Sequence, residues 1–233
     1  MDHSIPVYTV LRAVNTPDGQ RRWDDAPWND APALALANFH PAGSDHHPRA
    51  EAKMLYDDAN LYGLFRVEDR YVVCRHEEYQ AAVYEDSCVE FFVKPKPDRG
   101  YMNFEMSCGG NLLLYCISDW RRKSYPAEPD DEFESFVKVP KTIGARVALF
   151  HSMPARIDTE ITAPVVWTLE FHIPLDVLEE YIGPLRPLAG QTWRANFNKC
   201  ADASSHPHWA TWAPIGPELN LHQPEHFGVL RFE

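Results

Sequence analysis

Alternation of apolar and polar residues recurs along this chain and is clearest in residues 165–173. There Trp167 and Phe171 fall on one side, whereas Glu170 falls on the other. A period of two is typical of a β-strand with one buried face and one polar face. The same alternation occurs in residues 87–93, 101–107 and 192–199. The chain is therefore expected to fold mainly from half-buried strands.

Turn signals separate these runs. The segment Asp57-Asp58-Ala59-Asn60 predicts the turn of a hairpin, because Asp and Asn side chains close turns on their own backbone. Residues 94–100 contain two prolines and a glycine, which indicates a loop. Residues 175–182 have the apolar spacing of a helix, which Gly183 ends. About ten to twelve strands result, and the pattern predicts an all-β fold, an antiparallel, jelly-roll-like β-sandwich with one short helix.

The size and charge of the chain limit what it can be. Its 233 residues fit a single domain over residues 1–233. Residues 118–135 are polar and predict a long loop within that domain. The net charge of −12 argues against nucleic acid and against an anionic membrane as partners, but not against a neutral ligand such as a sugar.

Cysteine usage and the amino end bear on redox state and location. The five cysteines are odd in number and form no CxxC pair, so neither a disulfide framework nor a thiolate zinc site is predicted. Residues 1–6 do not resemble a signal peptide, and no apolar run reaches membrane length. The chain as written is expected to be cytoplasmic, or secreted or periplasmic if a leader has been removed.

The polar faces of the strands are the first candidate site. They carry Glu90, Asn103, Glu105, Glu170, His172, Arg194, Asn196 and Asn198, with Lys199 next in sequence and the aromatic residues Tyr84, Trp120, Trp209 and Trp212 nearby. If these strands are neighbours, carboxylates, amides and aromatic rings share one surface, and that combination suits a sugar. The alternative is an ordinary solvated outer face, which periodicity alone favours.

Other chemistry was weighed against this site. Glu90 and Glu105 lie on adjacent predicted strands and could serve a glycoside hydrolase or lyase, but nothing in the sequence places either acid where its pKa would rise. The histidines at 206, 208, 222 and 226 are expected to be exposed loop residues rather than metal ligands. No cofactor is predicted. The His151/Met153 pair is a poor candidate for haem, and structural calcium, with Asp57, Asp58, Asn60 and Asp69 as oxygen ligands, is the one metal left open.

Several segments in order along the chain carry a resemblance to a known family. They are Leu55–Tyr62, Val67–Asp69, Asp86–Phe92, Tyr101–Glu105 with Gly109 and Gly110, Trp167–Glu170 with Ile173 and Pro174, Arg194–Phe197, and His222–Gly228. Together they resemble the sugar-binding modules of carbohydrate-binding family 9, which are attached to xylanases, and more distantly the DOMON β-sandwiches. The resemblance covers roughly residues 5–233.

The resemblance implies a non-catalytic domain that binds a mono- or oligosaccharide between two aromatic walls. On the matching motif Glu90 is the carboxylate that hydrogen-bonds the sugar. Tyr84 is the expected first wall, where the xylanase modules have Trp, and Trp209 or Trp212 is the second. The predicted sugar-binding set is therefore Tyr84, Glu90, Asn103, Glu105, Arg194, Asn196, Lys199, Trp209 and Trp212, with no catalytic or metal-binding residue.

Overall fold

The computed structural model describes residues 5–122 and 133–233. Within this part of the chain the strands are β1 (Val7–Arg12), β2 (Leu34–Leu36), β3 (Asn38–Phe39), β4 (Arg49–Tyr56), β5 (Asn60–Asp69), β6 (Val72–Cys74), β7 (Cys88–Lys94), β8 (Tyr101–Ser107), β9 (Leu112–Arg122), β10 (Phe133–Lys138), β11 (Ala148–His151), β12 (Ile157–Ile161), β13 (Val165–Pro174), β14 (Thr192–Cys200), β15 (Trp209–Thr211) and β16 (Gly228–Phe232). The helices are η1 (Trp28–Asp30), η2 (Val83–Glu85), α1 (Lys141–Gly144), α2 (Leu175–Ile182) and η3 (Pro224–His226). No helix in the described part is long and apolar enough to span a bilayer.

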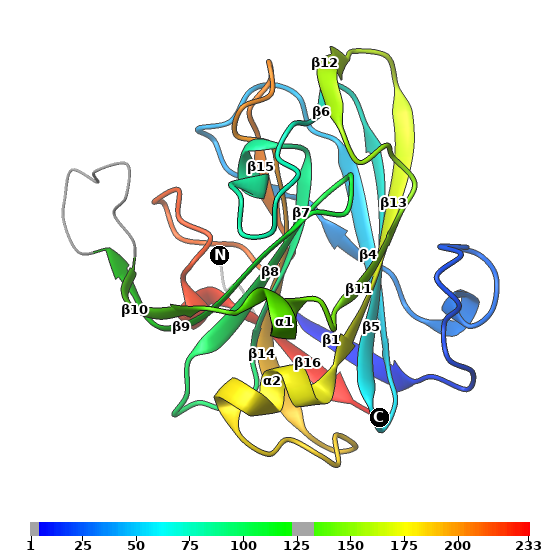
Figure 1. The fold of residues 1–233 in the computed structure, drawn as a ribbon, viewed down its shortest axis with the longest axis vertical. Helices are drawn as coiled ribbons and strands as arrows, with labels where there is room; N and C mark the ends of the chain where they lie inside the picture. The colour runs from blue at the N-terminus through cyan, green and yellow to red at the C-terminus, as the bar shows by residue number, and fades with distance from the viewer. Residues whose placement is uncertain (1–4, 123–132) are drawn as a thin grey trace.

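The main strands form one long sheet that curls into two facing layers (Figure 1). The first layer has the order β10-β9-β8-β7-β14-β16, and the second has the order β4-β5-β13-β11. β1 joins the layers, since it pairs in parallel with β16 and in parallel with β4. The prediction of an all-β sandwich is confirmed, although the β1 pairings are not antiparallel. The expected alternation of buried residues is present in β7, β8, β13 and β14.

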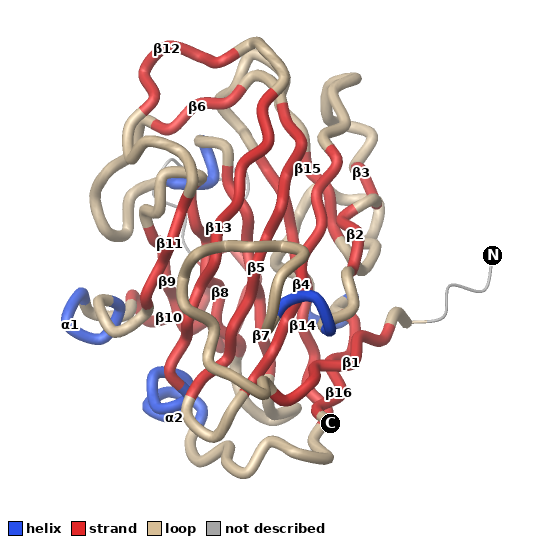
Figure 2. Tube along the Cα trace, turned by 90° about the vertical axis from the view of Figure 1, so that its right-hand side faces the viewer, coloured by secondary structure: helices blue, strands red, loops and turns tan. Residues whose placement is uncertain are grey.

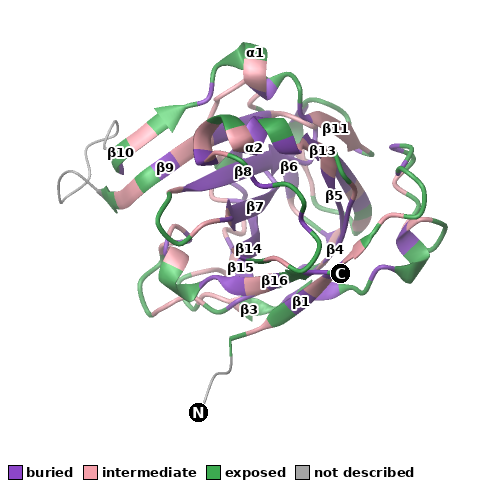
Figure 3. Cartoon of the chain, turned by 90° about the horizontal axis from the view of Figure 1, so that it is seen from below, coloured by how far each residue is buried: buried purple, intermediate pink, exposed green. Residues whose placement is uncertain are grey.

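The core lies between the two layers (Figure 3). The rings of Phe91 and Phe171, from opposite layers, are stacked with centroids 5.4 Å apart. Phe65 and Phe197 meet at 6.0 Å across the same gap. Burial of each such ring contributes about 1.5–3 kcal/mol, so this aromatic contact holds the layers together.

The hairpin of β4 and β5 forms as predicted. Oδ1 of Asp57 accepts hydrogen bonds from the backbone N–H groups of Ala59 (2.8 Å) and Asn60 (2.7 Å), which closes the turn. The hydroxyl of Tyr62 donates to the other oxygen of Asp57 at 2.6 Å. The turn residues therefore act within the hairpin itself.

The predicted helix is α2, which closes one open end of the sandwich (Figure 1). Its residues Leu175, Val177, Leu178 and Ile182 are buried in the core. α1 adds a single further turn of helix. The predicted loop over 118–135 is partly wrong, because β9 continues to Arg122 and β10 begins at Phe133; residues 123–132 lie outside the described part of the chain.

Candidate functional site

The outer face of the first layer is buried and polar. Glu90 of β7 is directly opposite Glu105 of β8 and directly opposite Asn198 of β14. The next cross-strand row holds Asn196, Phe92 and Asn103. The polar members of both rows are at most 3% exposed. This face is therefore not a solvated exterior, and the alternative that periodicity favours is wrong here.

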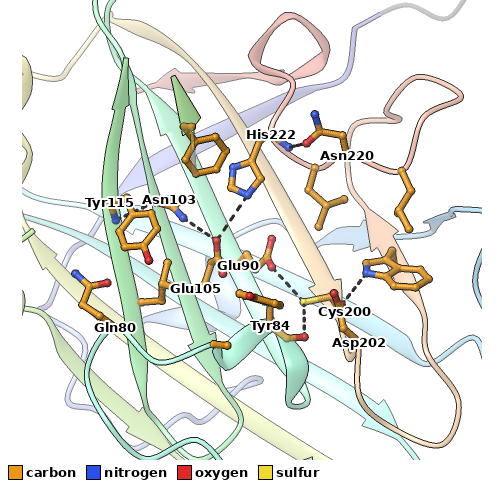
Figure 4. Close-up of a pocket in the computed structure, with 16 residues that line it drawn as sticks. Gln80, Tyr84, Glu90, Asn103, Glu105, Tyr115, Cys200, Asp202, Asn220 and His222 are labelled. Atoms are coloured by element: carbon orange, nitrogen blue, oxygen red, sulfur yellow. Dashed lines mark hydrogen bonds and ion pairs between the residues drawn. The ribbon is translucent and has the colours of Figure 1, made fainter. Parts of the chain in front are cut away.

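Loops from three parts of the chain cover this face and leave a cavity of about 460 Å³ (Figure 4). The cavity is lined by Gln80, Ala82, Tyr84, Glu90, Asn103, Glu105, Leu113, Tyr115, Phe133, Cys200, Asp202, Trp209, Leu219, Asn220, Leu221 and His222. Its size lies in the range of small-molecule pockets, roughly 300–1,000 Å³. The covering loops precede β7, follow β14 and precede β16.

Glu90 lies on the cavity floor with a fixed carboxyl group. Nδ2 of Asn198 donates to its Oε2 at 3.0 Å, and the thiol of Cys200 donates to its Oε1 at 3.1 Å. Burial raises the pKa of Glu90 to about 7, although the bond from Asn198 acts in the other direction. The structure thus places an acid in a site where its pKa rises, which the sequence did not indicate.

Glu105 is held from two sides. Nδ2 of Asn103 donates to its Oε1 at 2.6 Å, and Oδ1 of Asn103 accepts from the backbone N–H of Tyr115 at 2.9 Å. Nε2 of His222 lies 3.9 Å from the same oxygen of Glu105 (Figure 4). The His222 ring stacks on Phe92 with centroids 4.7 Å apart, so this loop histidine has a fixed place in the site.

Asp202 and the aromatic residues form the other side of the cavity. The indole N–H of Trp209 donates to Oδ1 of Asp202 at 2.7 Å. The backbone N–H of Asp202 donates to the carbonyl of Tyr84 at 3.0 Å, which ties the loop after β14 to η2. Burial raises the pKa of Asp202 to about 6. Tyr84 is 40% exposed, so part of its ring is available at the rim.

The structure brings five of the nine predicted residues together at this cavity: Tyr84, Glu90, Asn103, Glu105 and Trp209. Four others do not line it: Arg194, Asn196, Lys199 and Trp212. Each of these four has a different environment.

Lys199 lies on the core side of β14, away from the cavity. It is completely buried, and its ammonium donates to Nε2 of His208 at 2.8 Å and to the carbonyl of Cys200 at 2.9 Å. Its Nζ also lies 3.5 Å from Asp69, which accepts a 2.9 Å bond from His46. The expectation that His208 is an exposed loop residue is wrong, since it is 1% exposed.

The remaining three residues support loops or the core. Nδ2 of Asn196 donates to the carbonyl of Ala213 at 3.0 Å, and its Oδ1 accepts from the N–H of the same residue at 2.9 Å. Arg194 donates to the carbonyl of Glu225 at 3.2 Å. The ring of Trp212 packs against Phe197 in the core with centroids 5.8 Å apart.

Glu170 and His172 lie in the second layer and do not share the surface of Glu90. They hydrogen-bond each other at 2.7 Å. Glu170 also accepts from the backbone N–H groups of Gly19 (3.1 Å) and Arg21 (3.0 Å), from the segment that crosses this layer (Figure 2). Two polar strand faces of one chain thus lie on opposite sides of the molecule.

Several lining residues were not predicted. Gln80, Tyr115, Asp202, Asn220 and His222 come from loops or from β9, and no periodicity brings them to the Glu90 face. Only the expected tail motif containing His222 pointed to that segment. The expectation that His222 is exposed is wrong, because it is stacked on Phe92 beneath the loop.

The candidate calcium ligands do not form a site. Asp57 closes a turn, and Asp58 pairs with Arg12. Asp69 lies at the other end of the ten-residue strand β5, about 30 Å away at 3.4 Å per residue. Calcium needs six or more oxygens around one point, which these residues do not supply.

A different set of potential metal ligands occurs among the described residues. Atoms of Cys88, Glu90 and Cys200 lie within 4.8 Å of one another. Burial raises the pKa of Cys88 to about 12, so it is a thiol rather than a thiolate ligand at neutral pH. The His151/Met153 pair is a local turn, in which Nδ1 of His151 lies 2.7 Å from the carbonyl of Met153.

Comparisons with known proteins agree with this architecture. The model of carbohydrate-binding family 9 matches residues 29–232. A proposed carbohydrate-binding protein from Bacteroides uniformis is 25% identical, with a TM-score of 0.83 over 99% of this chain and 100% of that one. No curated protein matches the chain.

Two further structures share the fold at lower identity. Both are family 9 carbohydrate-binding modules from Caldicellulosiruptor kristjanssonii, one in complex with cellotriose and one with glucose. Each is 15% identical and covers 98% of this chain. The TM-scores are 0.63, over 94% of the cellotriose-bound chain, and 0.60, over 96% of the glucose-bound chain.

Proposed function

Because this chain belongs to carbohydrate-binding family 9, we propose that the cavity over Glu90 and Glu105 is where it binds a sugar, without covalent chemistry. One observation supports this location above the others. Two buried carboxylates, an amide and aromatic side chains converge on a cavity of about 460 Å³. Sugar hydroxyls need fixed acceptors and donors, and the C–H face of a sugar ring packs on aromatic surface.

Each group has a defined part in the proposed complex. Glu90 and Glu105 accept hydrogen bonds from hydroxyl groups. Tyr84 at the rim and Trp209 on the opposite loop provide the aromatic surface. The cellotriose and glucose complexes of the Caldicellulosiruptor modules make a glucose-type mono- or short oligosaccharide the first ligand to test.

The test is a calorimetric titration with a panel of neutral mono- and disaccharides. We expect saturable binding that weakens about tenfold or more in Glu105→Gln and in Tyr84→Ala, because each loses a charged hydrogen bond or a stacking surface. The chain offers a matched pair of tryptophans: Trp209→Phe should weaken binding, whereas Trp212→Phe should not, since only Trp209 lines the cavity. Binding that none of the cavity variants changes would place the site elsewhere.

A second function, glycoside hydrolysis, is favoured by one observation. The raised pKa of Glu90 and its position opposite Glu105 are features of a general acid beside a second carboxylate. However, both oxygens of Glu90 are already hydrogen-bonded within the protein. We expect no new reducing ends when the protein is incubated with oligosaccharides; turnover that Glu90→Gln abolishes would establish the enzyme instead.

A further inference from the structure

We propose that this cavity prefers a sugar that carries a free, protonated amine over the neutral sugar of the same shape, and that it excludes anionic sugars. The inference rests on the proposed function, since it names the class of sugar for the same cavity. It starts from the charges that the cavity walls carry.

Three carboxylic acids face the cavity, and no Lys or Arg is among its described lining residues. Glu90 and Glu105 are directly opposite on adjacent strands, and both are at most 3% exposed. Like charges at such positions repel, and a buried charge without a counter-ion is costly. Asp202 adds a third acid whose charge acts on Glu90. A cation in the cavity would relieve this arrangement.

The cavity also has more acceptors than donors. The amide N–H of Asn103 is taken by Glu105, that of Asn198 by Glu90, and the indole N–H of Trp209 by Asp202. Both ends of the Gln80 amide bind the backbone at Leu114. A ligand therefore meets mainly carboxylate oxygens. An ammonium group supplies three donors and no acceptor, which fits such a wall better than a hydroxyl group.

A buried acceptor beside Glu90 supports the same conclusion. Oδ1 of Asn198 is fully buried and has no hydrogen-bond partner among the described residues. It lies on the same face of the first layer, next to Glu90 in the cross-strand row. Such an acceptor is costly to leave unsatisfied, and a donor-rich ligand or a water brought in with it would satisfy it.

The nearest protein cation is already used. Lys199 acts on Glu90, but its ammonium is on the other face of β14 and is bound by Asp69 and His208. The titratable groups that face Glu90 are Glu105, Asp202, Cys88, Cys200 and, through the sheet, Lys199. His222 faces Glu105 at 3.9 Å and adds positive charge only when it is protonated.

The experiment compares four sugars by calorimetry at about pH 6.5, where an amine near its usual pKa is protonated. They are glucose, glucosamine, N-acetylglucosamine and glucuronate, with EDTA present so that no metal ion at Cys88, Glu90 and Cys200 contributes. Glucosamine should bind about 10- to 100-fold more tightly than glucose, as expected for a charged hydrogen bond. Glucuronate should not bind, and the amide of N-acetylglucosamine should remove the preference.

Variants locate the effect. Glu90→Gln keeps the shape of the side chain and should reduce the glucosamine preference, and Asp202→Asn provides a second test if the first variant folds poorly. Asp158→Asn changes the overall charge equally at an exposed site away from the cavity and should keep the full preference.

Proton release provides a separate readout. Glucosamine binding in two buffers of different ionisation enthalpy should release protons, because the ammonium group favours the ionised form of Glu90. Glucose that binds as tightly as glucosamine would overturn this inference while leaving the proposed function intact. If none of the four sugars binds, the proposed function fails as well.

Discussion

The buried ammonium of Lys199 is held by groups from three separate segments. His208 comes from the loop after β14, Asp69 from the end of β5, and His46 reaches Asp69 from the loop before β4. Burial alone would raise the pKa of Asp69, but the charge of Lys199 and the bond from His46 outweigh it and hold that pKa well below its usual range. At the scale of residues this cluster is structural, although it lies directly behind the cavity floor.

Removal of one partner should therefore be costly. We expect Lys199→Met to lower the free energy of unfolding by about 3–5 kcal/mol, because it leaves the Asp69 carboxylate buried without its cation. Urea unfolding followed by tryptophan fluorescence measures the change. The double variant Lys199→Met/Asp69→Asn should recover part of the loss. A single variant as stable as the wild type would show that the ion pair is not needed.

Glu90 gives the molecule a pH-dependent term of the opposite kind. Burial raises its pKa to about 7, so between its unfolded pKa of about 4.3 and 7 the folded state binds the proton more tightly. This contribution is fully present below the unfolded pKa and is lost as the pH rises through about 7. Glu90→Gln cannot ionise, so its stability relative to the wild type should increase by on the order of 2–3 kcal/mol from pH 4 to pH 8, about 1.4 kcal/mol for each unit of pKa difference. Urea titrations at both pH values test this, and a constant difference would contradict it.

Strand parity limited what could be foreseen for single residues. It correctly placed Glu90, Asn103 and Glu105 on one face. It also places Lys199 with Trp193 and Phe197 on the core side, so density of polar residues along residues 194–199 was the wrong criterion there. Asp202 and His222 could not be predicted, because loops that fold back over a sheet leave no periodic signal.

At the scale of elements, local chemistry was readable and long-range pairing was not. The turn at Asp57 and the helical spacing of α2 are local, and both form as predicted. The parallel pairing of β1 with β16 joins residues near opposite ends of the chain, for example Val7 with Val229. No local pattern encodes such a contact.

The contact of β5 with β13 shows how closely two elements pack. Gly63 lies opposite Phe171, and a methyl group on Gly63 would lie 2.1 Å from Cζ of that ring. Gly63→Ala should therefore lower the free energy of unfolding by about 1–3 kcal/mol through overpacking. Denaturant titration measures the change, and Gly63→Ala/Phe171→Leu should lose less than the two single effects added together. Strict additivity would argue against this contact as the cause.

At the scale of the whole molecule, the single strand β1 completes the hydrogen bonding of both layers (Figure 2). Without it, β16 and β4 would each present an unpaired edge, and such edges associate with other chains. Deletion of residues 1–12 should therefore give dimers or larger species, measured by light scattering during gel filtration, whereas deletion of residues 1–4 should leave the molecule unchanged. A monomeric, folded protein without β1 would show that the edges are protected in another way.

The parallel pairing of the two terminal strands also determines how the molecule responds to mechanical force. β1 begins beside the beginning of β16, and the chain leaves them from opposite ends, with further backbone bonds at Pro6, Val10, Arg12 and Glu233. Tension between the amino and carboxyl ends would load all of these bonds in shear at once rather than peel them one by one. A sugar-bound molecule that is pulled through its two ends should therefore resist extension until the whole β1–β16 seam breaks in a single step.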